Sequence, residues 1–145
     1  MIYLDTSAFI KLYIREEHSE SVNRIVIRQD EPLPVWFLHA LELRNAFNLK
    51  VFRQELTPAD ADGMAKLYQD RLQAGIYAAP RLEVSDLAAT AIQLTTHTRH
   101  LGCRSLDILH VAAAKLIGVR RFVTFDDRQR RLAETVGLKV SWPRP

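Results

Sequence analysis

The sequence has 145 residues, of which 48% are hydrophobic and 26% charged, and this size and balance predict a single domain spanning residues 1–145. Its one cysteine, Cys103, excludes an internal disulfide framework, and no uncharged apolar run is long enough to span a membrane. The net charge is +3, and the N-terminus has no basic region ahead of an apolar stretch, so we expect no secretory signal and a cytoplasmic location.

Short runs of apolar, β-branched or aromatic residues predict β-strands, and the first of them ends directly at Asp5. We expect Trp36 and Phe37, which fall inside the second run, to belong to the core rather than to stack on bases. The predicted strands are residues 2–4, 34–38, 121–125 and 138–140.

Helical patterns fill the intervals between these runs. The clearest starts at Thr57-Pro58, an N-cap threonine followed by a proline in the first helical position, and continues with an apolar stripe of Ala61, Met64, Tyr68 and Leu72. Gly118 and Gly137 are suited to close two later helices in the left-handed conformation. The predicted helices run from near His39 to Gln54, from Pro58, from about Ser85, from Ser105 to Gly118, and from near Asp127 to Gly137.

Strands that alternate with helices predict parallel pairing, with helices on both faces of the sheet. Ligands of such sheets bind beyond the carboxyl ends of the strands, and Asp5 and Asp126 each directly follow a predicted strand. Glu42 lies at the edge of the apolar stripe of its helix, where we expect it to be partly buried. Asp107 lies in a first helical turn, so by itself it is also explained as an acid that supports the helix dipole.

Carboxylates that converge at one sheet edge repel one another, at a cost of up to about 4 kcal/mol for a pair 4 Å apart. Divalent cations offset this cost, and oxygen ligands without a His or Cys cluster favour Mg²⁺ or Mn²⁺ over Zn²⁺. Ions held by carboxylates also suit phosphodiester hydrolysis, because they activate a water and stabilise the leaving oxygen.

Other residue types give weaker indications. The five histidines include no His-x-x-x-His pair joined to a Glu base, so we interpret them as ordinary surface or core residues, and we expect Cys103 to be buried. The second half of the chain is the basic half, with 13 Lys and Arg against 8 Asp and Glu in residues 61–145. Five arginines there fall within twelve positions and either contact nucleic-acid phosphates or form a solvated face: Arg120, Arg121, Arg128, Arg130 and Arg131.

Four segments together resemble the PIN-domain nucleases, and most closely the VapC-type toxins of toxin-antitoxin modules. They are Tyr3-Leu4-Asp5-Thr6-Ser7-Ala8, Ala40-Leu41-Glu42-Leu43, the stretch from Arg104-Ser105-Leu106-Asp107 to Ala114, and Phe122-Val123-Thr124-Phe125-Asp126. The resemblance implies a three-layer α/β/α PIN-like fold with a mainly parallel central sheet, Mg²⁺- or Mn²⁺-dependent cleavage of RNA, a homodimer, and a cognate antitoxin that masks the site.

By the same resemblance, the catalytic and metal-binding acids are Asp5, Glu42, Asp107 and Asp126, with Ser7 and Thr124 as supporting hydroxyls. Asp127 leaves an ambiguity, because the fourth acid is either residue of the Asp126-Asp127 pair, and Asp126 is favoured because it directly follows Thr-Phe.

The main alternative is a catalytically inactive PIN-fold module that binds RNA or a protein partner; the presence of all four acids argues against it. A phosphoacceptor receiver domain would need a lysine after a late strand, where this chain has Asp126. A haloacid-dehalogenase-type phosphatase would place a second aspartate two residues after the first, where this chain has Ser7.

Overall fold

The computed structural model describes residues 1–141, so the last four residues of the predicted domain lie outside the described part. Its strands are β1 (Ile2–Leu4), β2 (Leu33–Pro34), β3 (Tyr77–Ala78), β4 (Arg121–Val123) and β5 (Val140–Ser141). Its α-helices are α1 (Thr6–Phe9), α2 (Ser19–Ile27), α3 (Phe37–Phe52), α4 (Pro58–Gln73), α5 (Val84–Leu94), α6 (Thr98–Leu101), α7 (Ser105–Ile117) and α8 (Asp127–Thr135). Short 3₁₀ turns at Ile10–Leu12 and Thr95–His97 complete the fold.

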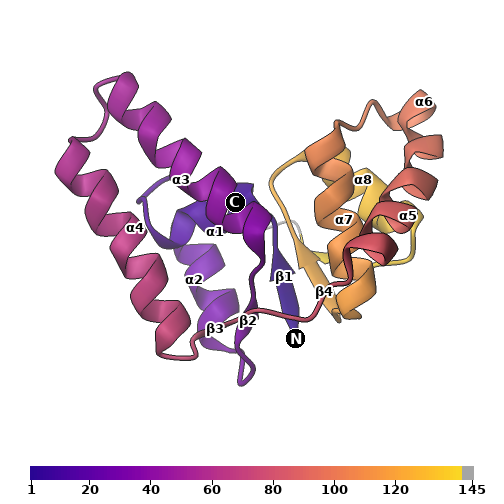
Figure 1. The fold of residues 1–145 in the computed structure, drawn as a ribbon, viewed down its shortest axis with the longest axis horizontal. Coiled ribbons are helices and arrows are strands. Elements are labelled where there is room, and N and C mark those ends of the chain that lie inside the picture. The colour runs from indigo at the N-terminus through magenta and orange to yellow at the C-terminus, as the bar shows by residue number, and fades with distance from the viewer. Residues whose placement is uncertain (142–145) are drawn as a thin grey trace.

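Every strand pair in residues 1–141 is parallel, as the alternation of strands and helices predicts. β4 lies between β1 and β5, with Tyr3 opposite Phe122 and Val123 opposite Ser141, while β2 and β3 form a separate two-stranded sheet. β2 packs beside β1, so the two short sheets continue one layer across the middle of the molecule (Figure 1).

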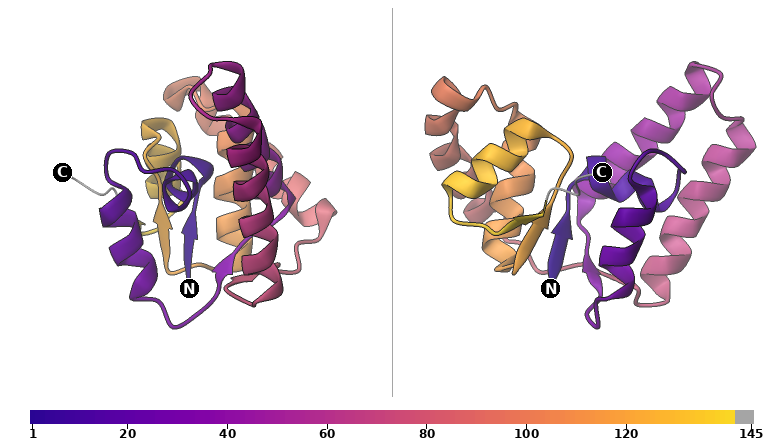
Figure 2. Two further views of the ribbon diagram at one scale, coloured as in Figure 1. Left: turned by 90° about the vertical axis from the view of Figure 1, so that its left-hand side faces the viewer. Right: turned by 180° about the vertical axis from the view of Figure 1, so that it is seen from behind.

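Helices cover both faces of this layer, which confirms the three-layer α/β/α prediction. Side chains alternate along a strand, and Tyr3 and Phe122 therefore face α5, α7 and α8, whereas Ile2, Leu4 and Val123 face α1 to α4. Figure 1 shows α3 and α4 on one side of β1 and β4 and the helices from α5 to α8 on the other, and Figure 2 shows α8 beside α7 from behind. No helix in residues 1–141 is long and apolar enough to cross a membrane.

The helix signals in the sequence identify the observed caps well. The Thr57 hydroxyl accepts from the Asp60 amide at the start of α4, and Gly118 ends α7 with φ of 71°. Gly137 follows α8 with φ of 85°. These left-handed conformations suit glycine because it has no Cβ.

The prediction of a strand over residues 34–38 was wrong at its carboxyl end. β2 ends at Pro34, and α3 already starts at Phe37, two residues before the predicted start. The reason is His39: Nδ1 of its ring accepts a hydrogen bond from the Trp36 amide, and this bond fixes the beginning of the helix. Trp36 is buried as expected, but Phe37 is 65% exposed and so is not a core residue.

Of the two predicted strands near the C-terminus, one is shorter than predicted and the other is shifted. The strand predicted over residues 121–125 ends at Val123, because the Thr124 hydroxyl accepts a hydrogen bond from the Asp126 amide and so forms a turn. The strand predicted over 138–140 lies instead at Val140–Ser141. The sequence patterns did not predict α1, α2, α6 or the two-residue strand β3.

Candidate active site

Asp5 is held rigidly at the carboxyl end of β1, where it is wholly buried. Its side chain caps α1 by accepting from the Ala8 amide at 3.0 Å, the Ser7 hydroxyl donates at 2.7 Å, and the Thr124 hydroxyl donates at 2.7 Å. Burial raises the pKa of Asp5, and the hydrogen bonds from Thr124, Ser7 and Ala8 oppose this shift only in part. The structure thus places both predicted supporting hydroxyls against Asp5.

Asp126 joins the loop after β4 to the same site. The Phe125 amide donates to the Ser7 hydroxyl at 2.9 Å, which ties the loops after β1 and β4 together. The Asp126 carboxylate caps α8 through the Arg128 amide at 2.8 Å. Asp127 instead has a 59% exposed side chain that pairs with Arg130, so Asp126 is the acid of this pair that faces the site.

Asp107 supports the start of its helix and also lines the candidate site. It is the third residue of α7 and accepts from the Arg104 backbone amide at 2.8 Å, so it supports the helix start. Its buried carboxylate also accepts from the Arg104 guanidinium at 3.1 and 3.2 Å and from the Gln129 amide at 3.3 Å.

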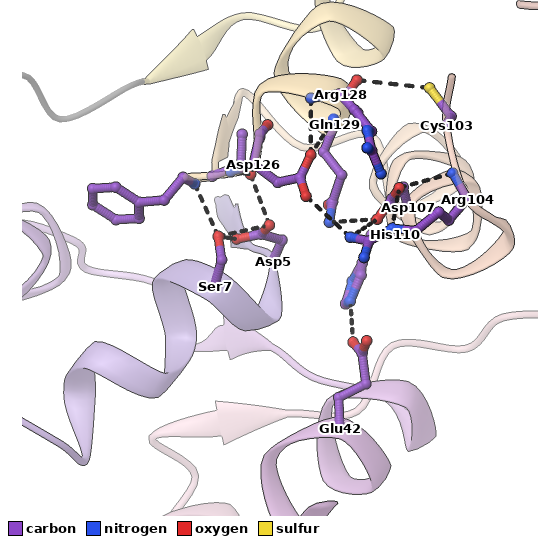
Figure 3. A network of polar contacts seen from close by, with 12 residues as sticks. Asp5, Ser7, Glu42, Cys103, Arg104, Asp107, His110, Asp126, Arg128 and Gln129 are labelled. Atoms are coloured by element: carbon purple, nitrogen blue, oxygen red, sulfur yellow. Dashed lines mark hydrogen bonds and ion pairs between the residues drawn. The ribbon is translucent and has the colours of Figure 1, made fainter. Parts of the chain in front are cut away.

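The Arg104 guanidinium bridges two of the predicted acids. It contacts Asp107 and also reaches Asp126 at 3.1 Å, while its side chain remains 65% exposed (Figure 3). From the sequence we expected divalent cations to offset the repulsion between these carboxylates; in the structure the positive charge of Arg104 also lies between Asp107 and Asp126. Sequence reasoning treated Arg104 only as part of a motif, although its spacing of three residues before Asp107 places the two on neighbouring positions of the helix start.

Glu42 reaches the site from the second turn of α3 and is partly buried as predicted, with 22% of its side chain exposed. Its Oε2 accepts from the Thr6 hydroxyl at 2.6 Å and lies 2.6 Å from Nε2 of His110. Burial raises the pKa of Glu42, but the hydrogen bonds from His110 and Thr6 outweigh burial and leave the pKa below its usual range.

His110 is a site residue that sequence reasoning missed, because we interpreted the histidines as ordinary surface or core residues. It is wholly buried in the core, yet it contacts a predicted metal-binding acid. The signal that identifies it is its position three residues after Asp107, one turn along the same helix.

A cavity of about 260 Å³ collects these groups at the carboxyl ends of β1 and β4. Glu42, Asp107 and Asp126 line it together with Thr6, Ser7 and Arg104. Asp5 is not part of the lining and lies buried behind Ser7. Leu106 and Gln129 complete the wall.

The donor set fits a hard divalent cation in its chemistry, because the acidic ligands and hydroxyls offer only oxygen atoms. Within residues 1–141, however, no three acidic, imidazole or thiol side chains already converge as a metal cluster. The Arg104 contacts explain part of this separation, since the guanidinium occupies the space between Asp107 and Asp126.

The five arginines of the sequence cluster separate into two groups. Arg120 and Arg121 lie at the start of β4, at the opposite end of the strand from the acids, and Arg120 pairs with Glu31. Arg128, Arg130 and Arg131 lie on α8, next to Asp126, and Arg130 pairs with Asp127 and Glu134.

The α/β/α layers and the acidic cavity at the carboxyl ends of the strands define the class of this protein. The PIN domain model matches residues 2–135, and the chain belongs to the PIN domain family. It is 30% identical to Ribonuclease VapC46 from Mycobacterium tuberculosis (strain ATCC 25618 / H37Rv) over 144 residues, which cover 98% of this chain and 97% of that protein. The resemblance to VapC-type PIN proteins is thereby confirmed.

The fold is also similar to that in a crystal structure of FitAcB from Neisseria gonorrhoeae. The TM-score is 0.62 at 20% identity, over 97% of this chain and 96% of that chain. At this identity the similarity shows a shared fold.

Proposed function

We propose that this protein is a divalent-metal-dependent endoribonuclease that acts in the cytoplasm as the toxin of a toxin-antitoxin system. The observation that carries the proposal is the cavity into which α3, α7 and the loop after β4 each contribute one carboxylate, from Glu42, Asp107 and Asp126. The full-length similarity to a protein named as a ribonuclease supports the choice of RNA as the substrate.

The proposed cofactor is Mg²⁺ or Mn²⁺, held by Glu42, Asp107 and Asp126 with Asp5 behind them. When bound, such an ion supplies an activated water and stabilises the leaving oxygen of a phosphodiester. The chain itself supplies orientation: Ser7 and Thr124 fix the Asp5 carboxylate, and the Asp126 carboxylate is fixed by the first turn of α8.

Arginines beside the cavity are suited to bind the RNA backbone. Arg128 and Arg131 are exposed on α8, next to Asp126, whereas Arg120 and Arg121 are exposed at the far end of β4. We expect all of them, with Arg130, to bind phosphates, so removing one such arginine should reduce the slope of log affinity against log salt by about 1. The double variants Arg128→Gln/Arg131→Gln and Arg120→Gln/Arg121→Gln compare the two groups, and an unchanged slope in both would leave only a solvated face.

A cognate antitoxin that covers the cavity and a homodimer complete the proposal. Co-expression with the protein encoded by the neighbouring reading frame should yield a complex that no longer cleaves RNA. The mass of the purified protein in solution, measured by light scattering, tests the dimer.

The deciding experiment is RNA cleavage by purified, partner-free protein. We expect cleavage with added Mg²⁺ or Mn²⁺, none in excess EDTA, and recovery when the metal is restored. Cleavage that persists in excess chelator would overturn the metal dependence. Protein that binds RNA but cleaves it under no metal condition would favour the non-catalytic module instead.

A further inference from the structure

Glu42 is anchored by only one of its two carboxylate oxygens. Its Oε2 accepts from Thr6 and also contacts Nε2 of His110. Within residues 1–141 no hydrogen bond engages Oε1, although the same residue lines the acidic cavity. The carboxylate is therefore fixed on one side and open on the other, which is the arrangement a metal ligand needs.

The contact between Glu42 and His110 is the end of a buried chain of hydrogen bonds. The Trp36 indole lies 2.7 Å from the Tyr3 hydroxyl, and that hydroxyl lies 2.8 Å from Nδ1 of His110. Tyr3 and His110 are wholly buried, so water cannot substitute freely for these partners. These hydrogen bonds connect the Glu42 carboxylate to α7 through His110, to β1 through Tyr3, and to the start of α3 through Trp36.

The direction of this chain follows from the chemistry of its first member. An indole N–H can only donate, so the Tyr3 oxygen accepts from Trp36. The two partners of the Tyr3 hydroxyl in residues 1–141 are Trp36 and His110, and its own proton therefore goes to Nδ1 of His110. An imidazole that accepts at Nδ1 carries its proton at Nε2 and donates it to Glu42.

We infer that His110 is a positioning residue for Glu42, held by Trp36 and Tyr3 so that its Nε2 donates to the carboxylate. The contact, 2.6 Å long, holds Oε2 in place, and Oε1 of the same cavity-lining carboxylate has no hydrogen bond within residues 1–141. The inference deepens the proposed function and rests on it, since it gives Glu42 its role as a cation ligand.

Two variants separate orientation from packing. His110→Leu and His110→Gln both remove the imidazole from the same buried space, but the glutamine amide still donates a hydrogen bond toward Glu42. We expect His110→Leu to bind Mn²⁺ about 10- to 100-fold more weakly than the parent, the range typical when a hydrogen-bond partner of a metal ligand is removed, and His110→Gln to recover most of this affinity. Titration calorimetry with Mn²⁺ alone measures the affinity, and melting curves show that both variants are folded.

A second measurement addresses the tautomer without any metal. In metal-free protein labelled with ¹⁵N-histidine, long-range ¹H–¹⁵N correlation should show one protonated nitrogen in His110, Nε2. A proton on Nδ1, or equal Mn²⁺ affinity of His110→Leu and the parent, would overturn the inference. A parent protein that binds no Mn²⁺ would instead overturn the metal dependence of the proposed function, and the tautomer would still be decided by the spectrum.

Discussion

Folding of this protein should depend on pH through His39, a histidine outside the acidic cavity. The ring is wholly buried, its Nε2 donates to the Leu4 carbonyl at 2.9 Å, and its Nδ1 accepts from the Trp36 amide at 3.3 Å. Burial is the main cause that lowers the pKa of His39 to about 3. Both nitrogens are used by the neutral form, so protonation in the folded state would turn Nδ1 into a donor that faces another donor.

The sign of the effect follows from comparison with the unfolded chain, where a histidine has a pKa of about 6.5. Below that pH the unfolded chain takes up a proton that the folded protein does not, so the free energy of unfolding falls as the pH falls from about 6.5 toward 3. At pH 5 the pH lies about 1.5 units below the unfolded pKa, which corresponds to a loss of about 2 kcal/mol at 1.36 kcal/mol per unit.

The test compares His39→Gln with the parent and with His100→Gln, in which an exposed histidine is replaced. Urea unfolding at pH 7 and pH 5 gives the change in unfolding free energy for each protein. We expect the parent and His100→Gln to lose about 2 kcal/mol more between these pH values than His39→Gln does. The difference between pH values is the readout, so a general loss of stability in His39→Gln does not affect it. An equal loss in all three proteins would refute the reasoning.

Three further predictions follow from local geometry. Asp126→Asn keeps a side chain that can cap α8, so it should melt close to the parent but cleave RNA about 100-fold more slowly or worse, whereas Asp127→Asn should remain active. Equal cleavage rates of Asp126→Asn and the parent would show that Asp126 is not part of the site. Thr124→Val removes a buried hydroxyl that bonds two aspartates and should cost about 1–3 kcal/mol in urea unfolding; a cost near zero would contradict these bonds. Gly118→Ala, at φ of 71°, should destabilise by about 1–2 kcal/mol, while Gly63→Ala, inside α4 with open space around it, should stabilise by about 0.5–1 kcal/mol; the same sign for both would be inconsistent with this account.

Local signals predicted much of the fold because they act over a few residues. The Thr57-Pro58 start of α4 and the Gly118 end of α7 need no distant partner, and both were confirmed. Elements of two to four residues, such as β3 at Tyr77–Ala78, are too short to show a period and form only because a neighbouring strand pairs with them. The start of α3 escaped prediction for a related reason, since it depends on the contact of His39 with the Trp36 amide.

Some residues of the candidate site were likewise predictable from the sequence and others were not. Topology places residues that follow parallel strands at one edge, so Asp5 and Asp126 were predictable as neighbours. The roles of Arg104 and His110 depend on which side chains meet after folding: one bridges two acids, and the other meets Glu42 across the sheet layer. Spacing from Asp107 in the sequence places both residues near that acid, but it does not show that Arg104 also reaches Asp126 or that His110 contacts Glu42.

The bond between Thr124 and Asp5 joins residues 119 positions apart, and β1 pairs with β4 rather than with a strand close to it in sequence. A ribosome therefore releases Asp5 long before the residues that complete its surroundings. Until β4 and the loop after it have been synthesised, Asp5 has neither its Thr124 partner nor the adjoining Asp126, and the cavity lacks a wall. The cavity therefore assembles only after residues 1–126 have been synthesised, because its wall is built from both ends of that stretch.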